Sequence, residues 1–234
     1  MKKAVITGSS KGIGKAVASK FVLEGYEVAI CSSNKTNIHE LREELLSIAP
    51  GAKVLASVCD MSDKKDVLDF AEEIKAQWES IDVLVNNAGI FLPDNILDTD
   101  EGRLEYILNL NFFSAYHLTR ALQDQLYQSP KSHIFNICSV ASLQAYTSGS
   151  LYTISKHTLL GFSRSLREEM KTKRVRVTSV FPGATFTDSW KGTEMPQERF
   201  MKAEDVAEMI WCTYNLSDRA VVEEILLRPL EGDI

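Results

Sequence analysis

The sequence predicts an α/β protein with a doubly wound, Rossmann-type parallel sheet of about seven strands in a single domain, residues 1–234. Short, continuously apolar, β-branched runs alternate with longer amphipathic segments, a pattern typical of strands that helices cover on both faces. A glycine-rich turn follows the first apolar run and opens an amphipathic segment, as in the first strand–turn–helix unit of that fold. No repeat, low-complexity tract or linker divides the chain, and 234 residues suit one domain.

Seven short apolar runs, each bounded by polar or turn residues, predict the strands. In chain order they span residues 3–7, 27–31, 53–58, 81–85, 132–138, 175–180 and 224–227. One segment with helical periodicity lies between each pair of consecutive strands, and the third is capped by Ser62 or Asp63. These helices span residues 13–23, 38–48, 62 or 63 to 78, 103–127, 151–171 and 204–214.

Asn109 and Asn111 lie inside the fourth helix, beside apolar residues. Asparagine side chains compete for backbone hydrogen bonds within a helix. The pair therefore predicts an irregularity that holds a water molecule.

Charge and hydropathy exclude some classes of protein. The net charge of −6 and the isoelectric point of about 5.3 argue against a nucleic-acid-binding protein, which is usually basic. No stretch approaches about 18 uninterrupted apolar residues, so no membrane-spanning helix is expected. The apolar start of the chain stops at Thr7, so no signal peptide is expected and a cytoplasmic location is predicted.

The four cysteines and four histidines show neither paired nor metal-ligand spacing, so no metal site is expected. The cysteines are interpreted as small core residues in a reducing compartment. They are Cys31, Cys59, Cys138 and Cys212.

The glycine-rich turn between the first strand and the first helix predicts a phosphate-binding site. Its glycines let the backbone approach a pyrophosphate, and the helix N-terminus supplies free amides. An ordinary strand–helix turn with glycines kept for packing is the alternative. The residues expected to contact a dinucleotide here are Gly8, Ser10, Lys11, Gly12, Ile13 and Gly14.

The end of the second strand bears on the choice of cofactor. An acid there would bind the ribose hydroxyls of NAD, but Ser32 and Ser33 follow the strand instead. Lys11 and Lys35 can meet a 2′-phosphate, so NADP(H) is predicted over NAD(H). The alternative is that both lysines are only solvated.

Two further strand ends are expected to line the same crevice, because ligands bind at the carboxyl ends of the strands in open α/β sheets. Asp60, followed by Met61, can accept a hydrogen bond from an adenine amino group or cap a loop. The fourth strand ends in Asn87, Ala88 and Gly89.

The most specific pattern is Tyr152 and Lys156, four residues apart on one helix face, with Ser139 thirteen residues before the tyrosine. A phenol can donate or accept a proton, and a nearby ammonium favours the ionised phenol. A hydroxyl can hold a carbonyl oxygen. These three groups suit the transfer of a hydride together with a proton.

In the order and spacing of these motifs the chain resembles the short-chain dehydrogenase/reductase family over nearly its whole length. The matching motifs are residues 7–14, residues 86–89, Asn111, Ser139, Tyr152 with Lys156, and residues 182–187. Cys138 stands where a second serine is common, and the tail lacks the glycine-rich ending frequent among oxoacyl-carrier-protein reductases.

The resemblance implies roles for these residues. Tyr152 is the acid in reduction and the base in oxidation, and Lys156 also binds the nicotinamide ribose. Ser139 orients the substrate carbonyl, and Asn111 holds a water that relays protons from Lys156. Contacts to the nicotinamide carboxamide are implied for Pro182, Gly183, Thr185 and Thr187. The helices at residues 103–127 and 151–171 form a dimer interface in the family, so a homodimer or homotetramer is predicted.

The irregular segment at residues 183–203 is interpreted as a substrate loop, because long loops in compact domains are usually functional. Its aromatic residues, with others near Ser139, predict a small apolar or aromatic carbonyl compound as substrate. Simple packing of the loop is the alternative for some of them. The candidates are Phe91, Gln144, Tyr146, Phe186 and Trp190.

The sequence thus predicts an oxidoreductase that transfers a hydride between NADP(H) and a carbonyl or secondary alcohol. The alternatives are a catalytically silent cofactor-sensing protein of the same fold and an NAD-dependent alcohol dehydrogenase. A nucleotide-sugar epimerase or dehydratase is disfavoured, because its glycine spacing differs and 234 residues leave no room for its substrate domain.

Overall fold

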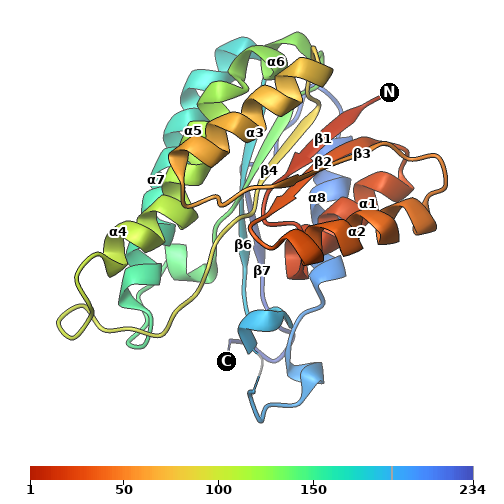
Figure 1. The fold of residues 1–234 in the computed structure, drawn as a ribbon. Helices are drawn as coiled ribbons and strands as arrows, with labels where there is room; N and C mark the ends of the chain where they lie inside the picture. The colour runs from red at the N-terminus through yellow and green to blue at the C-terminus, as the bar shows by residue number, and fades with distance from the viewer. Residues whose placement is uncertain (191, 234) are drawn as a thin grey trace.

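The computed structural model describes residues 1–190 and 192–233, and Figure 1 shows one sheet with helices on both sides. The sheet has seven strands, all parallel, in the order β3-β2-β1-β4-β5-β6-β7. The strands are β1 (Lys3–Ile6), β2 (Glu27–Ser32), β3 (Val54–Val58), β4 (Val83–Asn86), β5 (His133–Ile137), β6 (Arg176–Pro182) and β7 (Glu224–Leu227). The predicted doubly wound fold is confirmed. The strand order reverses between β1 and β4, and the crevice at such a point is where ligands bind.

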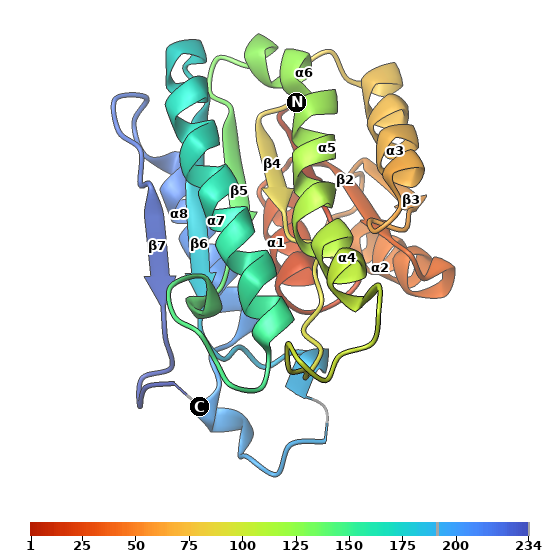
Figure 2. The same ribbon diagram turned by 90° about the vertical axis from the view of Figure 1, so that its left-hand side faces the viewer.

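Helices form a layer on each face of this sheet (Figures 1 and 2). One layer contains α1 (Gly12–Leu23), α2 (Lys35–Ile48) and α8 (Ala203–Asn215). The other contains α3 (Lys64–Gln77), α4 (Arg103–Leu108), α5 (Ser114–Ala121), α6 (Gln123–Gln128) and α7 (Ser150–Met170). Asp63 is the residue that caps α3, since its carboxylate accepts the backbone N–H groups of Lys65 and Asp66.

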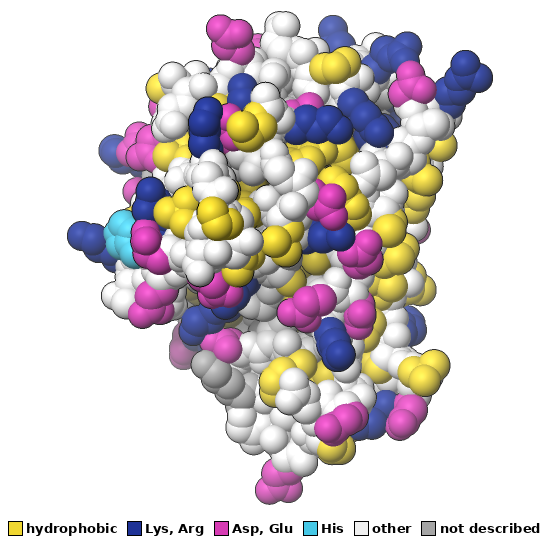
Figure 3. Space-filling view, turned by 90° about the vertical axis from the view of Figure 1, so that its right-hand side faces the viewer, with side chains coloured by type: hydrophobic (Ala, Val, Ile, Leu, Met, Phe, Trp, Pro, Cys, Tyr) yellow, Lys and Arg dark blue, Asp and Glu magenta, His cyan; other side chains and the backbone are white. Residues whose placement is uncertain are grey.

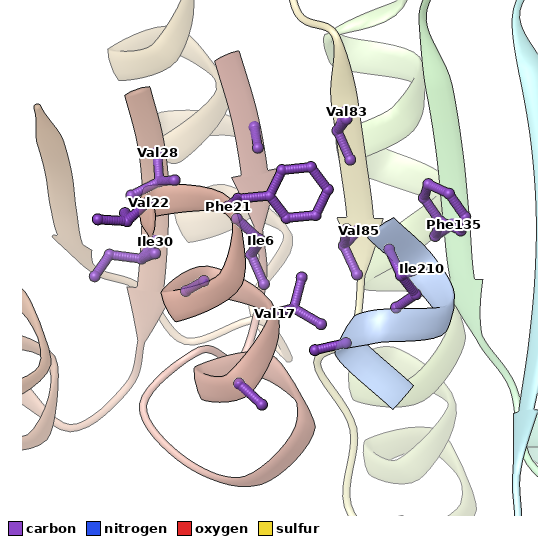
Figure 4. Packing of buried hydrophobic residues seen from close by; sticks show 14 of the residues in the cluster. Ile6, Val17, Phe21, Val22, Val28, Ile30, Val83, Val85, Phe135 and Ile210 are labelled. Atoms are coloured by element: carbon purple, nitrogen blue, oxygen red, sulfur yellow. The ribbon is translucent and has the colours of Figure 1, made fainter. Parts of the chain in front are cut away.

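The five inner strands, β2, β1, β4, β5 and β6, bury both of their faces and read as continuous apolar runs, whereas the edge strands β3 and β7 are partly exposed. Ile6 belongs to the core under α1, α2 and α8, whereas its neighbour Val5 belongs to the core under α3, α5 and α7. In the first core, Val17 and Phe21 of α1 lie against the β-branched residues of β1, β2 and β4 (Figure 4).

The prediction of one continuous helix at residues 103–127 is wrong, because this range contains several shorter helices. α4 runs into a five-residue π-helix, η1 (Asn109–Phe113), and α5 and α6 follow as separate pieces. The N–H of Ser114 bonds to the carbonyl of Asn109, the five-residue step of a π-helix. The irregularity expected at the two asparagines is therefore this π turn, which contains Asn111.

The interpretation of all four cysteines as core residues is also wrong for one of them. Cys31, Cys59 and Cys138 are buried, but Cys212 is exposed, because its position on α8 faces away from the sheet. No helix among residues 1–190 and 192–233 is long and apolar enough to cross a membrane.

Candidate active site

A cavity of about 620 Å³ lies over the carboxyl end of the sheet. It is lined by the turn before α1, the ends of five strands, the start of α7 and the loop after β6. The predicted site residues that line it are Gly8, Ser10, Lys11, Gly12, Ile13, Ser32, Ser33, Asp60, Met61, Asn87, Ala88, Gly89, Phe91, Ser139, Tyr146, Tyr152, Lys156, Pro182, Gly183, Thr185, Thr187 and Trp190. Those outside its lining are Gly14, Lys35, Asn111, Gln144 and Phe186.

The turn before α1 requires glycine for two different reasons. Gly8 and Gly12 have positive φ angles of 60° and 54°, which side chains disfavour. Gly14 has no such constraint, but a Cβ there would lie 2.5 Å from Asn87 Nδ2 and from Gly8 O. Gly14 therefore serves close packing, not the cavity lining.

The first turn of α1 fits a phosphate group. Its N-cap residue, Lys11, makes no side-chain cap, so the orphan amides of the helix are not satisfied by that side chain. A helix N-terminus of this kind binds anions through its N–H groups and its dipole.

Thr7 and Asn87 lock this turn to the end of β4. Thr7 Oγ1 accepts the N–H groups of Asn87 and Ala88 at 3.0 and 2.9 Å. The Asn87 amide in turn donates to the carbonyls of Thr7 and Gly8 at 2.9 and 3.0 Å. The bracing by Thr7 was not foreseen from the sequence, where only its place before the glycines marks it.

Beside the ends of β1 and β2, the hydroxyls of Ser10 and Ser32 lie 3.0 Å apart. Asp60 lines the cavity, but its Oδ1 also accepts the N–H and hydroxyl of Ser62 at 2.9 and 2.8 Å. Its loop-capping role is therefore present in the structure, and its second oxygen is the one a ligand would use.

The two lysines predicted to meet a 2′-phosphate are placed differently. Lys11 Nζ lies 2.6 Å from Asp188 Oδ2, a carboxylate from the loop after β6. Lys35 is the first residue of α2 and does not line the cavity. The ion pair is half exposed, so it is worth at most about 1 kcal/mol and a phosphate can replace the carboxylate.

Ser139 is held by the 3-10 turn that follows β5, η2 (Val140–Ser142). Its Oγ accepts the N–H of Ala141 at 3.1 Å, and its own N–H donates to Ser142 Oγ at 3.2 Å. Accepting this bond leaves the hydroxyl hydrogen of Ser139 to donate to an oxygen in the cavity.

Tyr152 and Lys156 face the same cavity from α7. Lys156 is 3% exposed; its Nζ donates to the carbonyl of Ile137 at 2.8 Å and lies 5.6 Å from the centre of the Tyr152 ring. Within residues 1–190 and 192–233, no carboxylate lies within 4 Å of this ammonium. Its charge therefore acts on Tyr152 and on whatever occupies the cavity.

Asn111 braces the loop after β4. Its Oδ1 accepts the N–H of Ile90 at 2.8 Å, and its Nδ2 donates to the Ile90 carbonyl and to Ser155 Oγ at 3.0 and 2.9 Å. Both hydrogens of the Asn111 amide are thus engaged. The predicted water could therefore only donate a hydrogen bond to an oxygen there, such as Asn111 Oδ1 or the Ile90 carbonyl. A Cβ on Gly89 would lie 3.2 Å from Asn111 Oδ1 and 3.5 Å from Lys156 Nζ, so the brace sits directly behind the site.

The substrate side of the cavity is aromatic. The Phe91 ring meets Tyr152 edge-on at 5.3 Å, and Tyr146, Trp190 and the unpredicted Tyr106 also line the wall. Gln144 instead bonds the Tyr146 hydroxyl at 2.7 Å on the exposed side, outside the cavity lining.

Phe186 packs against Phe200 at 5.6 Å, because a parallel bridge between Thr185 and Met201 turns this part of the loop back on itself. Trp190 contacts Phe200 at 4.9 Å and also lines the cavity. Packing is thus the structural role of Phe186, and Gln144 reaches the cavity wall only through its bond to Tyr146.

The fold and this cavity define a dinucleotide-dependent oxidoreductase. Residues 2–198 match the family described as short chain dehydrogenase, and the chain belongs to the short-chain dehydrogenase/reductase family. It is an NAD(P)-dependent enzyme that acts on alcohol or carbonyl groups.

Individual relatives cover almost the whole chain. A sepiapterin reductase of Chlorobaculum tepidum is 35% identical over 98% of this chain and 97% of its own. A metagenomic short-chain oxidoreductase in complex with NADP is 28% identical, covers 97% and 96% of the two chains, and has a TM-score of 0.84. An alcohol dehydrogenase from the archaeon Thermococcus sibiricus, complexed with 5-hydroxy-NADP, is 25% identical, covers 100% and 99%, and has a TM-score of 0.90.

Proposed function

We propose that the protein reduces the carbonyl group of a small aromatic or apolar compound with NADPH. The observation that carries this proposal is that Ser139, Tyr152 and Lys156 line one cavity with the glycine turn. The cofactor supplies the hydride that reduces the carbonyl carbon. The Ser139 hydroxyl donates a hydrogen bond to the carbonyl oxygen, and Tyr152 gives its phenolic proton to that oxygen as negative charge develops.

Lys156 and Asn111 support this proton transfer. The ammonium of Lys156 stabilises the phenolate that Tyr152 becomes, and the same phenolate is the base when an alcohol is oxidised. Asn111 acts as a positioning residue, because its amide holds the Ile90 backbone behind the site.

Exchange of Tyr152 tests this mechanism. Tyr152→Phe is expected to reduce turnover by a factor on the order of a thousand while NADPH binding is kept, because only the acid is removed. Tyr127→Phe on α6 is the matched control. If Tyr152→Phe turns over a good substrate normally, the mechanism is wrong; if the unchanged protein binds NADPH but reduces nothing, the cofactor-sensing alternative holds.

A preference for NADP(H) is supported by the absence of an acid after β2 and by Ser32 and Ser33 in the cavity lining. Three relatives at least 25% identical were solved with NADP or its 5-hydroxy form. The pairing of Lys11 with Asp188 favours the NAD-dependent alternative, because the carboxylate already neutralises the lysine that would meet a 2′-phosphate. Titration with NADPH and NADH, followed by tryptophan fluorescence, decides between them.

The aromatic wall formed by Phe91, Tyr106, Tyr146 and Trp190 supports an aromatic carbonyl substrate. Sepiapterin is the first compound to assay, because the relative from Chlorobaculum tepidum carries it in its name. An aliphatic ketone of similar size is the comparison. Equal kcat/KM for both would contradict the preference for an aromatic compound.

The assembly and location belong to the same proposal. We expect a homodimer or homotetramer in the cytoplasm, with the loop at residues 183–203 as the segment that selects the substrate. The exposed, unpaired thiol of Cys212 fits a reducing compartment.

A further inference from the structure

A second hollow, of about 310 Å³, lies at the amino end of the sheet, opposite the cofactor cavity. Its walls are the segment before β5, the start of β6, the end of α7 and the loop that precedes β7. The end of α7 and this loop lie at the same upper end of the molecule in Figure 2. Its volume is at the lower end of the range for small-molecule sites.

The lining of this hollow is strongly basic, although the whole chain carries a net charge of −6. One carboxylate, Asp218, lines it, 3.7 Å from Arg174. Figure 3 shows the side of the molecule on which α1, α2 and α8 lie, with Lys and Arg side chains and some Asp and Glu at its upper end. The cations that line the hollow are Lys131, Arg167, Lys171, Arg174, Arg176 and Arg219.

Neighbouring acids neutralise only part of this charge. Glu223 pairs with Arg167 at 3.1 Å, and Glu168 pairs with Lys171. Within the described chain, the ion pairs leave Lys131, Arg176 and Arg219 with no carboxylate inside 4 Å. The hollow therefore holds more positive than negative charge.

Arg176 is the strongest sign that the hollow suits an anion. Its side chain is only 9% exposed and lies over the Tyr214 ring, 5.4 Å from its centre. One guanidinium nitrogen donates to the Tyr214 carbonyl at 3.1 Å, whereas Nη1 has no hydrogen-bond partner in the described structure. Burying a cation without a counter-ion is costly, and an anion bound in the hollow would offset that cost.

The positive charge around the hollow also affects the ammonium of Lys131. Burial, followed by the charges of Arg176 and Lys2, lowers the pKa of Lys131 below its usual value. The cations of the hollow thus repel one another, and an anion between them would relieve that repulsion.

We propose that this hollow is a binding site for a small polyanion of phosphate type, held by Lys131, Arg176 and Arg219. Guanidinium groups match phosphate oxygens through paired hydrogen bonds, which a monovalent halide cannot use. The concave shape fits a small ion better than a protein surface, which needs a large flat contact.

Titration calorimetry with tripolyphosphate, at constant ionic strength and with the protein saturated with NADPH, tests this site. NADPH keeps the added anion away from the turn before α1. We expect one ion per chain and a raised midpoint of thermal unfolding. Replacing Lys131 and Arg219 together by Gln is expected to weaken binding about tenfold or more, because two charge-assisted contacts are lost.

Arg42→Gln is the matched control, since Arg42 is a half-exposed arginine on α2 that pairs with Glu43. Equal affinity in the control and in the double variant would overturn the proposal, as would no binding to the unchanged protein. If the protein does not bind NADPH, Lys11→Gln separates the two sites. Loss of tripolyphosphate binding in that variant assigns the ion to the turn before α1 and removes the hollow as its site.

Discussion

His133 is a buried neutral imidazole whose environment makes the stability of the protein depend on pH. It is fully buried, and its Nε2 lies 2.6 Å from the Thr178 hydroxyl, which donates to the Val222 carbonyl at 2.5 Å. Thr178 must therefore accept from Nε2–H, so Nδ1 carries no proton and has no partner in the described chain. Burial, then the charges of Arg176 and Lys131, lowers the pKa of His133 well below its usual value.

The free energy of unfolding should consequently fall in acid. Between the lowered folded pKa and the ordinary unfolded value of about 6.5, the unfolded chain binds more protons. Stability is thus highest above about pH 6.5 and falls below it by up to about 1.4 kcal/mol per pH unit. Urea unfolding across this range should show that slope, and His133→Gln should reduce it. The exposed His39→Gln is the control, and an unchanged slope in His133→Gln would contradict the assignment.

Lys11 tests the cofactor preference at a single charge. If its ammonium leaves Asp188 for a 2′-phosphate, Lys11→Gln should weaken NADPH binding about tenfold and leave NADH binding unchanged. Lys15→Gln, one turn along α1 and paired with Glu44 at 2.6 Å, should change neither. Fluorescence titration measures all four affinities. An equal loss for both cofactors would mean that Lys11 acts on the shared pyrophosphate.

Sequence spacing predicted the residues whose places follow from the backbone. Tyr152 and Lys156 share a helix face by periodicity, and Ser139 follows a strand that ends at the same edge of the sheet. Side chains on irregular segments were not predictable in this way. Phe186 turns toward Phe200 because of the bridge at Thr185, a long-range contact without a local signal.

At the scale of elements, the five inner strands were predictable because burial on both faces leaves continuous apolar runs. The π turn at residues 109–113 was visible only as two asparagines in an apolar stretch. One extra residue per turn barely alters the apolar pattern, so periodicity merged α4, η1, α5 and α6 into one helix.

The start of α7 depends on a carboxylate from another segment. Its N-cap, Gly149, offers no side chain and its first turn contains no acid. Asp94, in the loop after β4, accepts the N–H of Leu151 at 3.0 Å, next to Tyr152. This carboxylate caps the helix, and its negative charge interacts favourably with the positive end of the helix dipole.

Asp94→Ala should therefore lower the free energy of unfolding by about 1 kcal/mol. It should also reduce kcat more than it reduces affinity for NADPH, because the Tyr152 end of the helix loosens while the turn before α1 is untouched. Asp98→Ala, an exposed acid of the same loop, is the control for both measurements. A lower NADPH affinity with normal kcat would contradict the role of Asp94 in placing Tyr152.

At the scale of the whole molecule, the two ends of the sheet differ in chemistry. The carboxyl end holds the cavity proposed to bind the cofactor, and the amino end holds the basic hollow. Because all strands run parallel, strand ends of one kind share one edge, and the two sites are separated by the length of the strands. Ligands of the two sites should thus bind without competing.

The outer face of η1, α5 and α7 predicts how the molecule assembles. Phe112, Phe113, Tyr116 and Phe162 form a cluster with ring centres 4.7 to 6.5 Å apart, and Phe113 is 38% exposed. Figure 2 shows α4, α5 and α7 facing the viewer with no further layer over them. An apolar aromatic face of this kind marks an interface between proteins, and two copies of it can meet by a two-fold axis.

We therefore expect at least a dimer at micromolar concentration by light scattering. Phe113→Asp should shift it toward monomer, because burying a carboxylate in the interface is costly. Leu23→Asp is the control, since Leu23 is 61% exposed on α1, on the opposite side of the sheet. A monomeric mass for the unchanged protein, or equal masses for both variants and the parent, would remove this face as the interface. Retention of NADPH binding in the Phe113→Asp monomer would further show that each chain holds a complete cofactor site.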